Sequence, residues 1–441
     1  MNTTPDRLIL FTRYPEPGTT KTRLIPVLGP EGAAEFQRRL TERAAQVAVA
    51  ARTRRGLSLE IRHSGGSPTG MRQWLGEEFS YRPQGPGDLG TRMGACFRAA
   101  FEEGAERAVL IGADIPALSP AILTQAFDGL DCCDLVFGPA ADGGYYLIGA
   151  TAAGFRRSTA FLGSGITWGA PDVLARTLRR VRDAHLTCTL LETLADIDGP
   201  ADLPAALRTL AGRGDRPSVS IVIPALNEAD QLERTLSALS PSQDIEVIVV
   251  DGGSRDATLA IARTAGVRAL AARPPRSVQM NAGAAAAGGE ILLFLHADTR
   301  LPVKFQEPVH RTLASPGVAA GAFRLRIDAD GLGLRIIEQA ANWRSRFLQM
   351  PYGDQALFLR RDTFWGLGGF PSFPIMDDFE FIRRLTRKGR IAMVPDSVLT
   401  APRRWLRVGV GKTWLINQAI IAAYFMGAPP ERLAAWYRKK T

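Results

Sequence analysis

The chain has 441 residues, 46% of them hydrophobic, and a formal net charge of +10 at pH 7. This length exceeds one ordinary hydrophobic core, so we expect two domains. The charge would suit nucleic acid, but the arginines are scattered over apparent helix faces, as in the pairs Arg38/Arg39 and Arg179/Arg180. Arginine equally suits the phosphates of small molecules and acidic lipid headgroups. We therefore expect no nucleic-acid partner.

Two further features bear on location. The four cysteines lie in the first half without C-x-x-C spacing, and the N-terminal apolar run, residues 8–11, is too short for a signal peptide. We expect a cytoplasmic protein with reduced thiols. The apolar stretch 414–426 is shorter than the about 20 residues of a membrane span. It is either a core helix or a helix in the membrane interface, which leaves open a contact with the inner face of the cell membrane.

The first half alternates predicted strands and helices. Residues 8–11 predict a strand, and the loop that follows, residues 13–23, carries Lys21 and Arg23 before a helix begins. A loop with cationic side chains between a strand and a helix can hold phosphate. A second glycine-rich turn, residues 84–90, also precedes a helix and contains Gly87 and Asp88.

Carboxylates follow later strands of this half. Asp114 follows the strand 108–111, Asp142 follows the strand 135–139, and Asp196 and Asp198 lie near the end of the half. Each alone is an ordinary turn former or helix cap. Together with the cationic loop they predict a metal–nucleotide site on a mostly parallel sheet.

These segments resemble the DUF2064 family. The resemblance rests on the motifs at residues 17–24, 87–90, 112–116, 138–146 and 196–198, and it covers nearly all of residues 6–210. It implies a GT-A-like nucleotide-diphospho-sugar transferase fold, also similar to small nucleotidyltransferases. In this half we assign nucleotide binding to Lys21, Arg23, Gly87, Asp88 and Asp142, and metal binding to Asp114 and Asp198.

A short polar segment with glycine and proline, residues 211–217, predicts a linker between domains 1–210 and 218–441. Beyond it, the strand 219–223 is followed by Pro224, Asn227 and Glu228. The strand 245–250 ends at Asp251, which can accept hydrogen bonds from a nucleobase or ribose.

The central strand of the second half, residues 291–295, ends at His296 and Asp298. Ligands bind beyond the carboxyl ends of strands in open α/β sheets, so both side chains are expected in a site. A carboxylate there can hold a divalent cation, and the cation can hold a diphosphate. Asp298 occupies the place that Asp114 occupies in the first half.

Three further segments carry candidate site residues, and the last two have two interpretations each. A basic loop, residues 273–276, leads to Gln279 and Asn281. Asp377 and Asp378 begin a helix, where they could simply favour the helix dipole or include a base aimed at an acceptor hydroxyl. The run Arg403, Arg404 and Trp405 would either meet a diphosphate or form an exposed loop.

In combination these residues resemble the family-2 glycosyltransferases over residues 218 to about 438, with motifs of the rSAM/selenodomain-associated transferase 2 subgroup. The resemblance implies a GT-A fold, a sugar-nucleotide donor, inversion at the anomeric carbon and manganese or magnesium. It implies that Asp378 is the base, with Asp377 beside it, and that Asp298 holds the metal. The implied nucleotide-sugar residues are Pro224, Asn227, Glu228, Asp251, Arg276, Gln279, Asn281, His296, Arg403, Arg404 and Trp405.

The chain departs from that family pattern at two site positions. His296 replaces the first aspartate of the usual D-x-D motif, and Asp377 stands where glutamate is usual. Histidine can bind manganese or hydrogen-bond to the diphosphate, so His296 is a second candidate metal ligand.

The sequence thus predicts an α/β protein with two tandem GT-A-like domains. The second would be an inverting glycosyltransferase acting on a lipid-like or small-metabolite acceptor hydroxyl. The first would be a nucleotidyltransferase-like or glycosyltransferase-like domain. As a nucleotidyltransferase it would make the chain bifunctional, and as a binding module it would have no chemistry of its own.

Overall fold

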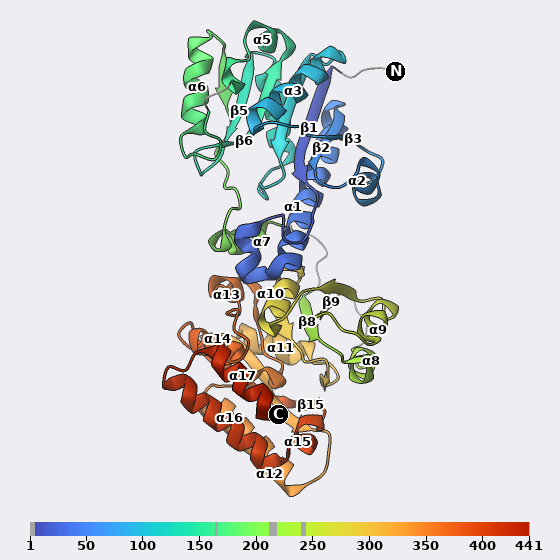
Figure 1. The fold of residues 1–441 in the computed structure, drawn as a ribbon, viewed down its shortest axis with the longest axis vertical. Helices are drawn as coiled ribbons and strands as arrows, with labels where there is room; N and C mark the ends of the chain where they lie inside the picture. Colours follow the sequence, from blue (N-terminus) through green and yellow to red (C-terminus); the bar gives the residue numbers. More distant parts are fainter. Residues whose placement is uncertain (1–4, 164–165, 211–217, 240–243, 441) are drawn as a thin grey trace. The chain divides into compact units, whose positions relative to one another are not determined.

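The computed structural model describes residues 5–163, 166–210, 218–239 and 244–440. The chain forms two compact units (Figure 1). The first comprises Met1–Lys21 and Ala34–Leu210, and the second comprises Thr22–Ala33 and Ala211–Thr441. The predicted linker 211–217 lies outside the described residues.

The first unit contains a seven-stranded sheet in the order β3-β2-β1-β4-β6-β5-β7. Its strands are β1 (Asp6–Arg13), β2 (Ser58–Ser64), β3 (Ser80–Pro83), β4 (Arg107–Gly112), β5 (Leu135–Pro139), β6 (Tyr145–Thr151) and β7 (Cys188–Leu190). All neighbouring strands pair in parallel except β6, which runs antiparallel to β4 and β5.

The helices of this unit are the longer part of α1 (Ile25–Arg55), then α2 (Pro68–Leu75), α3 (Leu89–Glu102), α4 (Pro120–Gly129), α5 (Ala152–Arg157), α6 (Val173–Asp183) and α7 (Leu203–Leu210). Short 3₁₀ turns lie at Thr22–Leu24, Ala160–Leu162 and Pro200–Asp202. Helix α1 is interrupted at Gly29 (φ 72, ψ 168), directly before Pro30. Proline cannot donate the backbone hydrogen bond that would continue a helix through this point.

Both faces of the first sheet are buried. Leu8 and Leu10 of β1 pack in one hydrophobic cluster, while Ile9 and Phe11 pack in another on the opposite face. Successive side chains of a strand point to opposite faces, so a strand covered on both sides is apolar throughout. This explains the unbroken apolar run that predicted the first strand.

The second unit contains an eight-stranded sheet in the order β10-β9-β8-β11-β14-β13-β15-β12. Its strands are β8 (Val219–Ala225), β9 (Ile245–Asp251), β10 (Arg268–Ala271), β11 (Ile291–Phe294), β12 (Thr299–Arg300), β13 (Val318–Ile327), β14 (Phe358–Arg360) and β15 (Arg390–Thr400). Its helices are α8 (Ala229–Ser237), α9 (Thr258–Thr264), α10 (Arg276–Ala286), α11 (Gln306–Ala314), α12 (Leu332–Phe347), α13 (Arg361–Gly366), α14 (Asp377–Leu385), α15 (Arg403–Val408), α16 (Val410–Phe425) and α17 (Pro430–Lys440).

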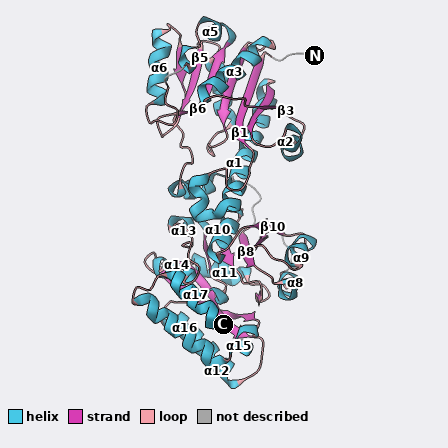
Figure 2. Cartoon of the chain, viewed as in Figure 1, coloured by secondary structure: helices cyan, strands magenta, loops and turns pink. Residues whose placement is uncertain are grey.

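The two sheets share one topology. When the short edge strand β12 is set aside, the second sheet repeats the strand order of the first. The pairing directions also agree, because β14 is antiparallel to both β11 and β13, as β6 is to β4 and β5. Helices pack along the strands of each sheet (Figure 2). The predicted fold class, two α/β domains with mostly parallel sheets, is confirmed.

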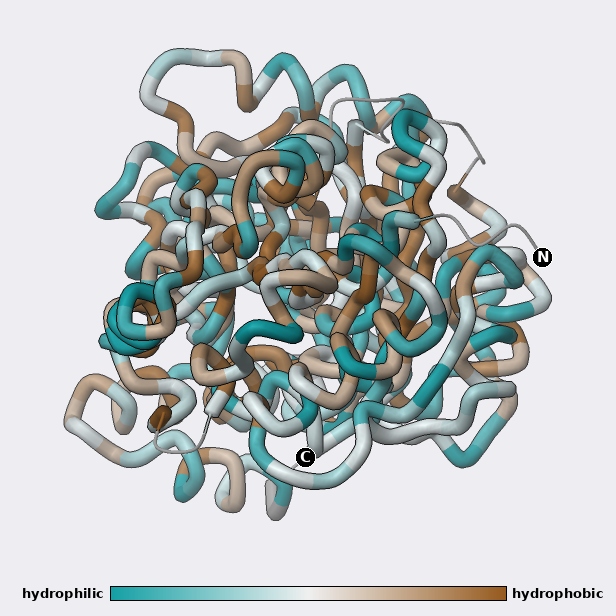
Figure 3. The backbone as a smooth tube through the Cα atoms, turned by 90° about the horizontal axis from the view of Figure 1, so that it is seen from above, coloured by the Kyte–Doolittle hydropathy of each residue, from teal (hydrophilic) through white to brown (hydrophobic). Residues whose placement is uncertain are grey.

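The apolar stretch 414–426 falls largely within α16, where Ile416 and Ile420 pack against Phe379 of α14. Trp414 and Leu415 of the same helix are exposed. Throughout the described ranges, no helix combines the length and apolar character needed to cross a membrane. In Figure 3 the tube accordingly changes between hydrophobic and hydrophilic colours within short stretches of chain.

Candidate active sites

A pocket in the second unit lies at the carboxyl ends of β8 and β11, where the sequence predicted a ligand site. Its lining includes Pro224 at the end of β8, His296 after β11, Arg276 at the start of α10, and Gly353 and Asp378. Strand ends position the first two of these side chains, while helix N-termini position Arg276 and Asp378.

Arg276 connects the polar groups of this pocket. Its Nη1 lies 2.9 Å from Nε2 of His296, and its Nη2 lies 3.5 Å from Asp377 Oδ1 and 3.7 Å from Asp378 Oδ2. A guanidinium can only donate, so Nε2 of His296 accepts and the imidazole is neutral. Burial, and then the charge of Arg276, lower the pKa of His296 to about 4. Because Nε2 accepts from Arg276, the proton of the neutral imidazole is on Nδ1, so His296 offers no free ring nitrogen to a cation in this arrangement.

Asp378 is held by two backbone amides. Its Oδ1 accepts from Phe379 N at 2.8 Å, and its Oδ2 accepts from Gly353 N at 3.1 Å. Met376, two residues earlier, has a left-handed backbone (φ 67, ψ 14), which is costly for a large side chain and typical of functional sites. The carboxylate therefore has a fixed orientation in the pocket.

Asp377 is buried beside it and differs in character. Burial raises the pKa of this carboxyl, while the charge of Arg276 opposes the shift. Its Oδ2 has no hydrogen-bond partner among the described residues. The two adjacent acids thus differ in their partners. Asp378 accepts two backbone hydrogen bonds, whereas Asp377 is paired with the charge of Arg276.

A second ion group lies nearby in the same unit. Arg403 of α15 forms an ion pair with Glu228 and lies 3.6 Å from Asp298 Oδ2. Burial raises the pKa of Glu228, and the hydrogen bond from Arg403 opposes this. Trp405 of the same helix is half-buried. The side chain of Arg404 lies outside the described part of the chain.

The predicted nucleoside residues order the turns after β8 and β9. Asp251 accepts from the backbone amides of Gly253 and Ser254, at 3.0 and 3.1 Å. Asn227 adopts φ 55, and its Oδ1 accepts from Arg255 N at 2.8 Å. These contacts bring the two turns together beyond the strand ends.

Gln279 and Asn281 lie on the buried face of α10 and differ in placement. A Cβ at Gly252 would lie 2.4 Å from Nε2 of Gln279, so this glycine allows the side chain to approach the β9 turn. Asn281 is fully buried, donates to Phe370 O at 2.8 Å and accepts from Phe370 N at 2.9 Å. Asn281 is therefore not among the residues that line the pocket, and its side chain fixes the turn at residues 369–370.

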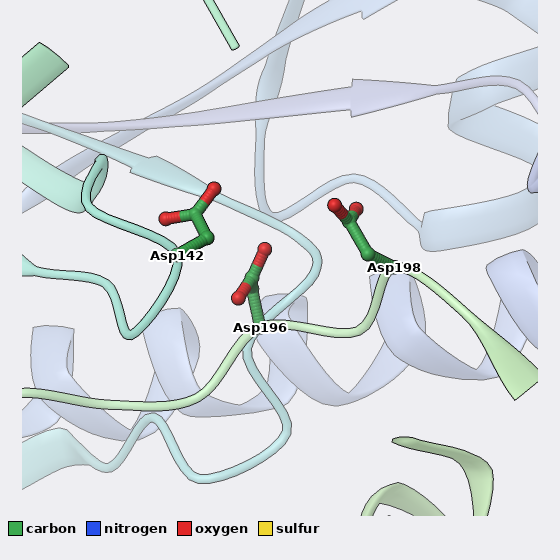
Figure 4. A group of neighbouring side chains, drawn as sticks. All are labelled: Asp142, Asp196 and Asp198. Carbon is green, nitrogen blue, oxygen red and sulfur yellow. The ribbon is translucent and has the colours of Figure 1, made fainter. Parts of the chain in front are cut away.

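The first unit contains a carboxylate cluster. One oxygen from each of Asp142, Asp196 and Asp198 lies within 4.8 Å of the others (Figure 4). Burial raises the pKa of Asp196, and repulsion from Asp142 and then Asp198 adds to the shift. A cation shared by the three carboxylates would relieve this repulsion.

Lys21 links this cluster to the next strand end. Its Nζ lies 3.1 Å from Asp114 Oδ1 and donates to the carbonyl oxygen of Ile197 at 2.6 Å. The structure therefore brings Lys21 close to the cluster of Asp142, Asp196 and Asp198, and Asp114 is paired with the lysine. The sequence pattern assigns no individual role to Asp196. The fold places it next to Asp142 and Asp198.

Three further residues that were predicted to bind nucleotide in this half are not part of the carboxylate cluster. Asp88 caps α3 by accepting from Thr91 N at 2.8 Å, and its hydrogen bonds with Thr91 lower its pKa. Gly87 adopts φ 98, and a Cβ there would lie 2.9 Å from Thr91. Arg23 belongs to the segment Thr22–Ala33, which is grouped with the second unit.

Comparison with known families follows the two units. The family DUF2064, described as uncharacterized and conserved in bacteria, matches residues 46–170, and Glycosyl transferase family 2 matches residues 220–368. The chain is a fusion of these two families. Its second region makes it a glycosyltransferase, so the predicted enzyme class is confirmed.

Individual proteins are similar to about half of this glycosyltransferase fusion. Glycosyltransferase AglE of Haloferax volcanii is 26% identical over 249 residues, which is 47% of this chain and 78% of the relative. A protein assigned as a nucleotide-diphospho-sugar transferase from Desulfovibrio desulfuricans G20 is 34% identical, covering 47% of this chain and 88% of that chain, with a TM-score of 0.44. A mannosyltransferase from Pyrobaculum calidifontis, solved with GDP-Man and Mn²⁺, is 22% identical and covers 50% and 73%, with a TM-score of 0.38.

Proposed function

We propose that the second unit transfers a sugar from a nucleoside-diphosphate sugar to an acceptor hydroxyl, with inversion at the anomeric carbon. The observation that carries this proposal is the fixed orientation of Asp378, whose two oxygens accept from the amides of Gly353 and Phe379. One oriented carboxylate suits a single displacement, in which the acceptor attacks the face opposite the leaving group. Asp378 takes the acceptor proton as the new bond forms.

Cationic side chains supply the complementary charge. The departing nucleoside diphosphate gains negative charge. Arg276 and Arg403 can stabilise it, and without a ligand each of them lies near two carboxylates. Guanidinium groups bind phosphate oxygens in a bidentate manner and stabilise this charge without a proton transfer. Asp377 positions Arg276 and does not contact the acceptor. Asn227, Glu228 and Asp251 hold the nucleoside.

A divalent cation fits this unit through Asp298. Magnesium and manganese commonly use one or two protein carboxylates and take further oxygens from substrate phosphates. Asp298 is one such carboxylate, and His296 would be a second ligand only if Arg276 left its Nε2. Bound there, the cation supplies further stabilisation of diphosphate charge. The relative solved with Mn²⁺ supports manganese.

Turnover and binding across UDP-, GDP-, CDP- and dTDP-sugars, with manganese or magnesium, test the proposal. The assay compares the full chain with Asp298→Ala and with Asp328→Ala, an exposed carboxylate paired with Arg300. We expect one donor to be turned over in a metal-dependent way, with loss in the first variant only. Equal activity of the two variants would exclude Asp298 as the metal ligand, and no turnover of any donor would exclude the proposed donor class.

A second activity is favoured by the cluster in the first unit. Asp142, Asp196 and Asp198 would hold a cation, and Lys21 would meet the phosphates of a nucleotide, as in a nucleotidyltransferase. Thermal unfolding of the full chain with manganese and nucleoside triphosphates, compared with Asp198→Asn, tests this. A ligand-dependent rise in melting temperature that Asp198→Asn removes would support it, and no rise would favour a binding module without nucleotide chemistry.

The acceptor is proposed to be lipid-like rather than a small metabolite. Trp414, Leu415 and Phe425 support this, because they are large apolar residues that stay exposed on α16, a helix that packs on the protein through Ile416 and Ile420. We accordingly place the protein in the cytoplasm, at the inner face of the membrane.

A further inference from the structure

Helix α12 has an unusual distribution of side chains. The face that packs on the protein mixes apolar and polar residues, with Leu334, Glu338, Ala341 and Ser345 buried. The opposite face carries Leu332, Ile336, Trp343 and Phe347, exposed over 85%, 66%, 58% and 60% of their surfaces. These four residues recur at intervals of four, seven and four, so they form one stripe along the helix. A surface helix normally buries such a stripe.

The polar residues on the inner side of α12 have a structural cause. Helix α12 covers the edge of β13 beyond its short pairing with β14, where backbone groups need partners. Asn342 accepts from Leu325 N at 2.8 Å and donates to Leu325 O at 3.0 Å, and Glu338 accepts from Ile327 N at 2.6 Å. These bonds fix the rotation of the helix, so the apolar stripe must face outward.

A cationic pocket of about 580 Å³ adjoins the stripe. Trp343 and Phe347 line it together with Arg324, Arg346 and Arg390, and no carboxylate is among its lining residues. The two aromatic rings are 5.4 Å apart, and the Arg346 guanidinium lies 5.5 Å from the Phe347 ring. Among the described residues, no acidic side chain forms an ion pair with any of the three arginines.

We propose that this surface, the α12 stripe with its arginine pocket, docks on an anionic lipid bilayer. Aromatic and aliphatic side chains flanked by cations are the chemistry of interfacial helices. The guanidinium groups would meet lipid phosphates, while Trp343 and the aliphatic residues enter the headgroup boundary. Docking here does not require the reaction proposed at Asp378.

A second copy of the chain fits the surface less well. A twofold contact places the same patch of both copies face to face, which would bring Arg324, Arg346 and Arg390 of each copy together. Like charges at an interface are unfavourable, and interface cores are depleted of charge. An anionic bilayer neutralises these arginines.

The docking surface also continues into the active pocket. Arg344 of α12 donates to Met350 O at 3.0 Å, and its guanidinium lies 3.5 Å from the Tyr352 ring. Tyr352 lines the pocket that contains Asp378. A bilayer bound at the stripe would therefore lie at the end of the helix that leads into the site.

Flotation of the full chain with phosphatidylcholine vesicles, with and without phosphatidylglycerol, tests the proposal. We expect binding only to the anionic vesicles. Each arginine near such a surface changes partitioning about fivefold, so the triple variant Arg324→Gln/Arg346→Gln/Arg390→Gln should bind about a hundredfold more weakly. Trp343→Ser/Phe347→Ser should lose binding as well. Arg263→Gln on α9 and Val303→Ser, both at exposed positions, are the matched controls.

Three results would overturn the proposal. The wild-type chain could fail to float with anionic vesicles, or both surface variants could float as well as the controls. A dimer in size-exclusion chromatography that Trp343→Ser/Phe347→Ser dissociates, without vesicle binding, would identify a second copy as the occupant. Asp378→Asn should float like the wild-type chain, which separates failure of docking from failure of the proposed reaction.

Discussion

Replacement of Asp378 by asparagine tests the proposed base most directly. The variant keeps the size of the side chain and one oxygen, but it cannot accept the acceptor proton. General base catalysis typically contributes about 10²–10⁴-fold, so we expect kcat to fall by this factor. The KM for the donor should change little, because Asp378 acts on the acceptor.

The structure also predicts a cost in stability. Both carboxylate oxygens accept from backbone amides, Gly353 N at 3.1 Å and Phe379 N at 2.8 Å. An asparagine can accept only one of these bonds well, since its amide nitrogen would face the other N–H. Leaving that donor unsatisfied should lower the free energy of unfolding by about 1–3 kcal/mol.

Steady-state kinetics with saturating acceptor, donor titration calorimetry and denaturant unfolding measure the three effects separately. Asp328→Asn, an exposed carboxylate paired with Arg300, is the matched control and should leave all three unchanged. Full turnover by Asp378→Asn would refute the assignment of the base. A loss of turnover that is matched by a loss of donor binding would instead indicate that the pocket has collapsed.

Other predictions follow from the same contacts. The folded-state pKa of His296, about 4, lies below its ordinary 6.5, so the unfolded chain binds more protons between these values. Stability should therefore fall as pH drops through this window, by about 3 kcal/mol, and denaturant unfolding should show less of this fall in His296→Gln. Arg403→Gln should raise the donor KM about 10–100-fold in steady-state kinetics, because a charged hydrogen-bond donor is lost beside Glu228. Asn342→Ala should lower the free energy of unfolding by about 1–3 kcal/mol, because two buried bonds to Leu325 are lost.

Much of the fold could be predicted because its signals are local. Apolar runs such as residues 8–11 and 291–295 are buried strands, and the polar residues at their ends lie at the carboxyl edge of a sheet. Since all parallel strands end on that edge, strand order alone brings Pro224 and His296 into one pocket. The shared order of the two sheets was suggested by the matching places of Asp114 and Asp298.

Contacts between distant segments could not be predicted in this way. Gly353 donates to Asp378 across 25 residues, and Arg403 meets Glu228 across 175. Neither pairing has a sequence signal. A backbone amide is present in almost every residue, and an arginine in this chain has many glutamates that it could pair with. The outward stripe of α12 contradicts ordinary amphipathic reasoning, since an open strand edge overrides the hydrophobic preference.

The two sites differ in charge although the sheets share a topology. In the first unit burial, and then the charges of Asp142 and Asp198, raise the pKa of Asp196, and a bound cation would relieve this repulsion. In the second unit Arg276 lies between His296 and two aspartates, so its charge is already balanced without a ligand. An incoming diphosphate competes for that arginine. We expect Arg276 to move its contacts from Asp378 to the diphosphate when the donor binds. Asp378 would then be free to act as the base, so donor binding would precede activation of the acceptor.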